Sequence, residues 1–396
     1  MAREPLRVVR VRGEGARLVE RYGALMVYRK WVERGGAEHG ELVVVENSRG
    51  DLIGCGFYDE VGPVALRLVE LHTCSFSSPK EALYHLLERS YAARTRLGLA
   101  GPEKGYRLVH SDGDYLPGLI VDIYADLAVI QLSSAVWDRY RGEIVKALVD
   151  VVGVRHVYEK STQRTRLDIG LKPFERLLYG EKTATTIREG EALFFVDARL
   201  GQKTGFFLDQ RMNRLEFGEL AEGRVLDLFS YTGGFGVHAL VNGAEEAVFV
   251  EEDERAVKIL RKNLEINRVA DRARIVNDNV WSFLGKQADS ALYDAMAVDP
   301  PAFIPHPGAR QQGIRAYRRL YTRAIRLAKE GALVFLSSCS SHLQRQEFSM
   351  IVAEAFQRAR RSFTPLGDVR GMPPDHPVRP SAPHLAYLKA FFAIAY

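Results

Sequence analysis

The sequence contains few cysteines and no long apolar segment. Its three cysteines, Cys55, Cys74 and Cys339, show neither the spacing of a metal-binding site nor that of a disulfide framework. No apolar run approaches the ~18 residues that a membrane-spanning helix needs, and residues 1–15 lack the apolar core of a signal peptide. We therefore expect a protein with no metal site and no membrane span, located in the reducing environment of the cytoplasm.

The net charge is only slightly basic, but the basic residues are clustered. The 396 residues carry a formal net charge of +5. Residues 1–34 contain nine Lys and Arg against four Glu, and residues 310–329 contain seven Lys and Arg with no acidic residue. Such clusters are typical of a surface that binds a polyanion such as RNA, although a solvated charged surface has the same composition. The sequence leaves open whether the chain forms a homodimer.

The stretch 224–238 is the most informative part of the sequence. Val225–Phe229 is a short apolar run that predicts a buried parallel strand, with Asp227 inside it. A turn with Gly233 and Gly234 follows, and then a predicted helix. A strand, a glycine turn and a helix start place a ligand against backbone N–H groups, and glycine lets the backbone come close to that ligand. An ordinary βαβ unit is the alternative.

Polar residues follow the next two predicted strands. The strand Ala247–Val250 is followed by Glu251, twenty-four positions after Asp227, and an acid at this place usually binds a ribose diol. After the strand Ala273–Val276, either Asp278 or Asn279 offers an acceptor oxygen for the exocyclic amine of adenine. Together, these strand ends suit a nucleoside.

We expect the chain to form three consecutive domains, over residues 1–72, 73–190 and 191–396. Short strands separated by turn residues predict a β-rich first domain, namely Arg7–Val11, Leu42–Glu46, Ile53–Phe57 and Val64–Val69. A small central α+β domain is predicted by an amphipathic helix, a hairpin, a further strand and a second helix, over Pro79–Arg96, Tyr106–His110 with Leu119–Tyr124, Ala128–Leu132 and Trp137–Val149.

The third domain is predicted to be α/β and Rossmann-like. From Val225 onward, seven predicted strands alternate with helices, as in a doubly wound, mainly parallel sheet. Ligands of such sheets bind beyond the carboxyl ends of the strands. A basic helix is predicted over 310–329, after the fourth strand of this domain.

Two further strand ends carry residues suited to chemistry on a heterocycle. The fourth strand ends in Asp299-Pro300-Pro301-Ala302-Phe303, where two prolines make a rigid loop with free carbonyl groups. The fifth ends at Cys339, which is flanked by serines and is either a small core residue or an activated thiol. A Cys–Asp pair suits methylation of a pyrimidine at C5, because that carbon becomes nucleophilic only after a thiolate adds to C6.

Several motifs resemble those of one family. They are GQKTGFFLDQR at 201–211, DLFSYTGGFG at 227–236, DPPAF at 299–303, SCSSHL at 338–343 and DHPV at 375–378. The chain resembles the PUA-domain-containing, class I S-adenosyl-L-methionine (SAM)-dependent rRNA 5-methylcytosine methyltransferases of the large-subunit methyltransferase I type. The resemblance covers nearly the whole chain. It implies an N-terminal PUA domain, a class I methyltransferase domain, SAM as cofactor and the RNA of the large ribosomal subunit as substrate.

The resemblance also assigns roles to residues. Cys339 is implied to be the nucleophile, and Asp299 to hold the target base. The implied cofactor-binding residues are Asp227, Ser230, Tyr231, Gly233, Gly234, Glu251, Asp278 or Asn279, and Asp299. The expected substrate-binding residues are Pro300, Pro301, Phe303, Lys203, Arg211, Arg315 and Arg319. The chain departs from the family at Ala302, where a lysine is usual, so that any contact made by that lysine is absent.

Three other functions stay open at this point. A methyltransferase acting on adenine N6 or guanine N2 needs no cysteine, but it usually has an aromatic residue where this chain has Ala302. A methyltransferase acting on proteins or small molecules does not need the basic N-terminal residues. A non-enzymatic RNA-binding protein that keeps a cofactor site does not need Cys339.

Overall fold

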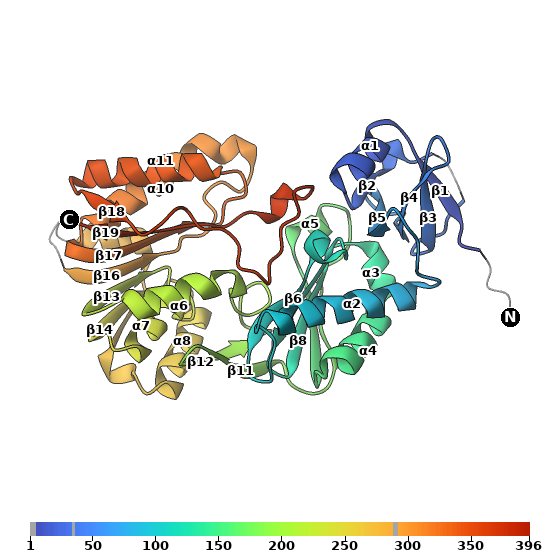
Figure 1. Ribbon diagram of the computed structural model, residues 1–396. Helices are drawn as coiled ribbons and strands as arrows, with labels where there is room; N and C mark the ends of the chain where they lie inside the picture. The colour runs from blue at the N-terminus through green and yellow to red at the C-terminus, as the bar shows by residue number, and fades with distance from the viewer. Residues whose placement is uncertain (1–4, 34–35, 288–291) are drawn as a thin grey trace. The chain divides into compact units, whose positions relative to one another are not determined.

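The computed structural model describes residues 5–33, 36–287 and 292–396. The chain forms two compact units, which do not follow the order of the sequence (Figure 1). The first comprises Met1–Thr186, Asp197–Gly205 and Pro374–Leu385, and the second Ile187–Val196, Phe206–Pro373 and Ala386–Tyr396. The three consecutive domains expected from the sequence stay a prediction.

The N-terminal part of the first unit is a five-stranded sheet in the order β1-β3-β4-β5-β2. Its strands are β1 (Val8–Val11), β2 (Met26–Tyr28), β3 (Leu42–Asn47), β4 (Leu52–Tyr58) and β5 (Val64–Leu71). Four of them confirm predictions. The helix α1 (Gly13–Tyr22) and β2 were not predicted, because glycines at both ends of the first helical turn disfavour a helix in isolation. A Cβ added to Gly15 would lie 2.6 Å from the Trp31 Cβ, so glycine is needed for packing there.

A second five-stranded sheet in this unit has the order β10-β9-β8-β7-β6. Its strands are β6 (Gly105–His110), β7 (Leu119–Tyr124), β8 (Leu127–Leu132), β9 (His156–Ser161) and β10 (Phe174–Tyr179). The helices are α2 (Pro79–Arg96), α3 (Ala135–Arg139), α4 (Arg141–Val152) and the short α5 (Arg164–Leu167). The α2 helix and the β6–β7 hairpin confirm predictions. The single helix predicted over Trp137–Val149 is wrong: α3 and α4 meet at Tyr140, whose ring packs against Phe57 and whose hydroxyl donates to the Gly40 carbonyl.

The loop 374–385, which includes the DHPV motif, belongs to the first unit although the strands around it belong to the second. The Arg94 guanidinium donates to both carboxylate oxygens of Asp114 (2.5 and 2.7 Å) and to the Asp375 carbonyl (2.9 Å). The Asp375 carboxylate accepts from the Arg107 N–H at 3.0 Å. These buried polar groups satisfy one another, so they fix the loop on the central sheet.

The second unit contains the predicted seven-stranded, mainly parallel sheet, in the order β15-β14-β13-β16-β17-β19-β18. The strands are β13 (Arg224–Leu228), β14 (Glu246–Val250), β15 (Ala273–Val276), β16 (Tyr293–Val298), β17 (Ala328–Ser338), β18 (Phe363–Pro365) and β19 (Lys389–Ala395). The first five are parallel, and β19 is antiparallel to β17 and β18. The hairpin of β11 (Ala184–Glu189) and β12 (Ala192–Asp197) precedes the sheet along the chain.

Helices cover both faces of this sheet (Figure 1). They are α6 (Arg211–Leu220), α7 (Gly234–Val241) and α8 (Glu254–Ile266) on one face and α9 (Val280–Lys286), α10 (Arg310–Ile325) and α11 (Arg345–Ala359) on the other. The core beneath α9, α10 and α11 is built from apolar residues such as Leu226, Met296, Tyr321 and Phe348. The basic helix is shorter than the predicted 310–329, because β17 already begins at Ala328. No described helix is long and apolar enough to cross a membrane.

Candidate active site

The carboxyl ends of the five parallel strands lie at one edge of the sheet of the second unit. Leu228 of β13 pairs with Val250 of β14 and with Val298 of β16, so the ends of these three strands are in register. Val298 in turn pairs with Leu336 of β17. The loops that follow β13, β14, β15, β16 and β17 therefore meet at this edge, which is where an open parallel sheet binds its ligand.

The turn between β13 and α7 has an unusual backbone conformation. Phe229 has a φ of 60°, Tyr231 of 50° and Gly233 of 87°. Left-handed conformations at two bulky aromatic residues are costly, and they occur mostly at functional sites. The turn is held by the Ser230 N–H, which donates to the Val250 carbonyl at 3.1 Å, and by the Gly233 N–H, which donates to the Ser230 carbonyl at 2.7 Å.

Asp227 is fully buried beneath this turn. Its carboxylate accepts a hydrogen bond of 2.9 Å from the Gly236 N–H in the first turn of α7. Burial raises the pKa of Asp227 to about 7, the Gly236 N–H opposes this shift, and the charges of Asp299 and Glu251 add to it. The single Gly236 N–H donor does not offset the burial of this carboxyl group, so its charged form is disfavoured. The site therefore suits a ligand that brings further hydrogen-bond donors.

Glu251 follows β14 and lies half-buried in the same place. Its carboxylate accepts from the Tyr231 N–H at 2.8 Å and from the Asp253 N–H at 2.9 Å. Burial raises the pKa of Glu251, and these two N–H groups oppose the shift. Each oxygen keeps a free lone pair, so the carboxylate can still accept from two hydroxyl groups.

Two buried hydroxyl groups in the β13–α7 turn are free to hydrogen-bond to a ligand. Ser230 is 5% exposed and Thr232 is 1% exposed. Within the described part of the chain, neither hydroxyl oxygen has a hydrogen-bond partner. Buried polar groups are normally paired. Together with the α7 N-terminus and the two acids, they fit a polar cofactor with an amino acid and a ribose part.

The glycines of this turn are needed for packing within the protein, and their predicted contact with the cofactor stays a prediction. A Cβ added to Gly233 would lie 2.3 Å from Leu260, one added to Gly234 would lie 2.6 Å from Arg214, and one added to Gly236 would lie 2.3 Å from Phe249. These neighbours are protein side chains. The glycines therefore allow α7 to pack closely on the sheet, and the turn owes its shape to that packing.

The two candidate adenine partners after β15 differ in their surroundings. The Asn279 oxygen accepts from the Trp281 N–H as the N-cap of α9, and the Asn279 amide donates to Glu252 at 2.7 Å. The Asp278 carboxylate accepts from Lys286 (2.7 Å) and Ser282 (3.1 Å), and Lys286 lowers the pKa of Asp278. Because a carboxylate has about four acceptor positions, Asp278 is better able to accept a further hydrogen bond.

Asp299 ends β16 and is held by residues from two other segments. Its Oδ1 accepts from the Gln210 side chain at 2.9 Å and from the Ser337 hydroxyl. The Gln210 oxygen in turn accepts from Asn213 at 2.6 Å. The GQKTGFFLDQR motif thus contributes Gln210 as a support for Asp299, a role that its composition alone did not indicate.

The DPPAF loop and the loop after β17 are tied together. The Ser340 hydroxyl accepts from the Ile304 N–H at 3.1 Å and lies 2.7 Å from the Tyr317 hydroxyl. The Phe303 ring packs on Tyr317, with ring centroids 4.7 Å apart. Cys339, partly exposed, lies with its Sγ 3.9 Å from the Pro300 carbonyl oxygen. The thiol and the Asp299 carboxylate therefore stand at the ends of neighbouring parallel strands.

Lys389 is a candidate site residue that the sequence analysis missed. It begins β19, pairs with Ser338 across the sheet, and is 4% exposed. Its ammonium group donates to the carbonyls of Ser340 (2.5 Å) and Tyr387 (2.7 Å). Burial lowers the pKa of Lys389 to about 8, while negative charge on Cys339 opposes this shift. A lone lysine at the start of a strand gives no signal of this kind, because only the fold brings it behind the thiol.

The predicted substrate-binding residues lie in different places. Pro301 is exposed and Pro300 is buried beneath it. Arg315 and Arg319 are exposed on α10. Arg211, in the first turn of α6, is only 7% exposed. Lys203 is exposed and belongs to the first unit, so it is described apart from this site.

Comparison with known proteins identifies related sequences for most of the chain. A family described as "PUA-like domain" matches residues 9–70, and one described as "Conserved hypothetical protein 95" matches residues 210–335. A ribosomal RNA large subunit methyltransferase I of Aeromonas hydrophila is 31% identical over 389 residues, 96% of each chain. A proposed ribosomal RNA large subunit methyltransferase of Methanocaldococcus jannaschii is 35% identical over 359 residues, which cover 90% of this chain and 89% of that one.

Among solved structures, a proposed methyltransferase in complex with SAH has the same fold. Its TM-score is 0.79 at 22% identity, with 98% of this chain and 100% of that chain covered. The fold is that of the class I methyltransferases, with an N-terminal PUA-like domain.

Relatives above 30% identity span nearly the whole length, and the chain belongs to the ribosomal RNA large subunit methyltransferase family, of the large-subunit methyltransferase I type. The predicted family, fold class and cofactor are thereby confirmed, and the chain is an enzyme that methylates RNA with SAM.

Proposed function

We propose that this protein forms 5-methylcytosine in the RNA of the large ribosomal subunit. The observation that supports this proposal is the partly exposed Cys339 thiol at the end of β17, beside the DPPAF loop and Asp299 at the end of β16. Methylation of an exocyclic amine has no use for a thiol in this place. The Ala302 of DPPAF is a second argument, since methyltransferases of amino groups usually have an aromatic residue there.

The residues around the β13–α7 turn suit the parts of SAM. The Ser230 and Thr232 hydroxyls and the N-terminus of α7 would bind the methionine part, and Asp227 would accept from its ammonium group. Glu251 accepts from the two ribose hydroxyls. Asp278 would accept a hydrogen bond from the exocyclic amine of adenine. When bound, SAM supplies a methyl group attached to a positively charged sulfur, which is already reactive toward a carbon nucleophile.

The protein's task is to make cytosine C5 nucleophilic. The Cys339 thiolate adds to C6, and the electron pair of the C5–C6 double bond moves toward C5 and N3. A hydrogen bond between the Asp299 carboxyl group and N3 stabilises the charge there. After the methyl group has moved to C5, a base removes the C5 proton and the C6–S bond breaks, which restores the ring and the thiolate. Asp299 or a water molecule serves as that base.

Two features of the loop hold the thiol in position. The Pro300 carbonyl and the rigid prolines fix one side of the Cys339 side chain, and the Ser340–Tyr317 hydrogen bond fixes the loop behind it. The buried Lys389 ammonium holds the Ser340 carbonyl and places a positive charge near the sulfur. A nearby cation favours a thiolate over a thiol.

Mass spectrometry of nucleosides tests the proposal. Large-subunit rRNA is incubated with the protein and methyl-labelled SAM, and we expect the label in 5-methylcytidine. Cys339→Ala should abolish the label and bind SAM as tightly as the native protein by calorimetry. Cys74→Ala, which changes a cysteine of the first unit, is the matched control and should stay active. Label in methyladenosine or methylguanosine, or full activity of Cys339→Ala, would refute the cysteine mechanism.

A further inference from the structure

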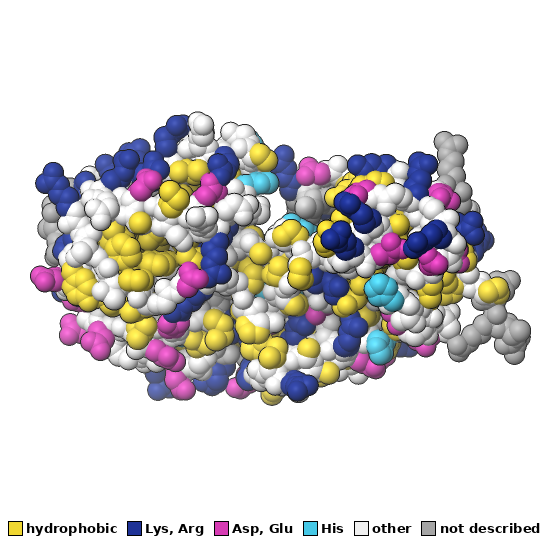
Figure 2. Space-filling model, turned by 45° about the horizontal axis from the view of Figure 1, so that its top comes forward, with side chains coloured by type: hydrophobic (Ala, Val, Ile, Leu, Met, Phe, Trp, Pro, Cys, Tyr) yellow, Lys and Arg dark blue, Asp and Glu magenta, His cyan; other side chains and the backbone are white. Residues whose placement is uncertain are grey.

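A hollow of about 680 Å³ on the second unit is lined almost entirely by arginine. Four of its arginines come from α10, one is the C-cap residue of α10, one comes from α11, and Thr322 is the other lining residue. These arginines are Arg315, Arg318, Arg319, Arg323, Arg326 and Arg358. They lie on the face of the sheet that α10 and α11 cover, and basic side chains border the unit there in the space-filling view (upper left in Figure 2).

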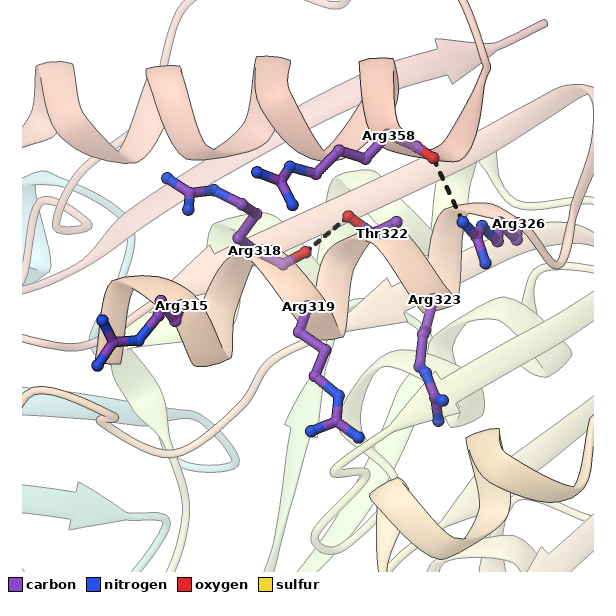
Figure 3. Close-up of a pocket in the computed structure, with 7 residues that line it drawn as sticks. All are labelled: Arg315, Arg318, Arg319, Thr322, Arg323, Arg326 and Arg358. Carbon is purple, nitrogen blue, oxygen red and sulfur yellow. Dashed lines mark hydrogen bonds between the residues drawn. The ribbon is translucent and has the colours of Figure 1, made fainter. Parts of the chain in front are cut away.

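The arginines are distributed along the whole of α10. Arg318 and Arg358 extend on the side of α11, whereas Arg319 and Arg323 extend to the opposite side of α10 (Figure 3). Arg319 lies over the Trp281 ring of α9, 5.4 Å from its centroid. From Arg315 to Arg326 the helix rises about 16 Å at 1.5 Å per residue. At the 3.4 Å per nucleotide of one strand, this is the length of about five nucleotides.

Four of these six side chains have no described counter-charge. Arg318 forms an ion pair with Glu354 of α11. Within the described ranges, no ion pair involves Arg315, Arg319, Arg323 or Arg358. Like charges so close together repel one another, and they are costly to hold on one helix without a counter-charge. The packing of α10 does not require them, because its buried face consists of other residues such as Tyr317, Leu320 and Tyr321.

The geometry suits phosphate groups better than other anions. The planar guanidinium group binds phosphate with two parallel hydrogen bonds, and several such groups in a row match a polymer with regularly spaced charges. Among the described residues, the hollow is lined by arginines and Thr322 and by no aromatic residue, so the lining itself offers no ring for stacking of bases. The hollow therefore suits contact with a nucleic acid backbone that does not depend on base sequence. Residues 304–309 connect the DPPAF loop to α10, and the Tyr317 hydroxyl of α10 lies 2.7 Å from the Ser340 hydroxyl, so the first half of α10 lies near the strand-end site.

We infer that this arginine-lined hollow binds the phosphodiester backbone of the substrate RNA on one side of the target nucleotide. The inference rests on the proposed function for the identity of its ligand. It adds Arg318, Arg323, Arg326 and Arg358 to the two arginines that the sequence singled out. Contacts along about five nucleotides would hold the RNA while its target base occupies the strand-end site.

Binding of a fluorescently labelled single-stranded RNA to the full-length protein tests the inference. The affinity is measured by anisotropy at several salt concentrations, for the native protein and for a variant with Arg315→Gln, Arg319→Gln and Arg323→Gln. Each phosphate contact on single-stranded RNA contributes about 0.7 to the slope of log K against log salt, so the slope should become less steep by about 2. At low salt, we expect the affinity to fall about tenfold or more.

A matched control changes the same number of charges on the opposite face of the sheet. Arg255→Gln, Lys258→Gln and Arg261→Gln alter exposed residues of α8 and should leave the slope unchanged. Arg358→Gln alone tests α11 and should reduce the slope by about 0.7. Binding of SAM by calorimetry shows that each variant is folded. Equal slopes for the α10 variant and the α8 variant, with SAM binding intact, would overturn the inference.

The same measurements separate this inference from the proposed function. Absence of 5-methylcytidine from the native protein's product, together with a reduced slope in the α10 variant, would refute the C5 reaction and support the hollow as an RNA site. Normal 5-methylcytidine formation by the α10 variant with an unchanged KM for RNA would support the reaction and refute the hollow.

Discussion

Asp227→Asn should make the protein more stable at neutral pH while it weakens cofactor binding. The carboxyl group is fully buried at the end of β13, and burial raises its pKa from an ordinary value near 3.8 to about 7. In the unfolded chain the group loses its proton near pH 4, whereas in the folded protein it keeps the proton until about pH 7. The neutral Asp227 carboxyl group therefore makes its full contribution to the free energy of unfolding below about pH 4. This contribution is lost as the pH rises to 7.

The size of this effect follows from the two pKa values. At 1.36 kcal/mol per unit, the buried charge lowers the free energy of unfolding by about 1.5 kcal/mol at pH 5 and by about 4 kcal/mol at pH 8. Asparagine is neutral at both pH values and keeps an oxygen that can accept from the Gly236 N–H. The gain in stability from Asp227→Asn should therefore be about 2.5 kcal/mol larger at pH 8 than at pH 5.

Urea unfolding without cofactor at pH 5 and pH 8 measures this difference, and calorimetry with SAM measures the loss of affinity. Asp294→Asn is a suitable control. Burial alone would raise the pKa of Asp294, but hydrogen bonding to Lys329 and to the Arg224 N–H outweighs it and lowers that pKa. Asp294 is thus ionised in the folded and in the unfolded protein from pH 5 to 8. Asp294→Asn should therefore change the free energy of unfolding by the same amount at pH 5 and at pH 8. A stability change for Asp227→Asn that does not grow with pH would refute the reasoning.

Two other substitutions test the packing of the site and the role of its lysine. Gly236→Ala places a Cβ 2.3 Å from the buried Phe249 ring and should lower the free energy of unfolding by about 1–3 kcal/mol. Gly142 has open space around it, so the control Gly142→Ala should be neutral or stabilising. Urea unfolding measures both. Lys389→Met should reduce methylation at pH 7 by about tenfold or more and move the acid limb of its pH–rate profile to higher pH. An unchanged profile would leave Lys389 only a structural role.

Much of the second unit could be predicted from the sequence because its signals are local. Short apolar strands alternate with amphipathic helices, and the N-cap of α8, Asp253, is of a residue type that marks a helix start. The third strand was predicted at its observed bounds, Ala273–Val276. Parallel strands with buried faces have near-continuous apolar sequences, and they are easy to recognise when turns separate them.

Features that depend on distant residues could not be predicted in this way. Gln210 supports Asp299 across 89 residues, and Lys389 reaches the Ser340 carbonyl across 49. The glycines of the β13–α7 turn are also required by Leu260 and Phe249, two side chains that come from other elements. In each case the neighbouring residue is defined only by the tertiary fold.

The path of the chain between its two units has a consequence for synthesis. The first unit is completed by residues 197–205 and by residues 374–385, which supply the Asp375 carbonyl to Arg94. On the ribosome, where domains generally fold as they emerge from the N-terminus, Arg94 and Asp114 are made long before this partner. The first unit can therefore not reach its final structure until residues 374–385 have been translated. The protein thus reaches its native state as a whole, and a nascent chain stalled before residue 374 would expose both unfinished units to the cell's proteases.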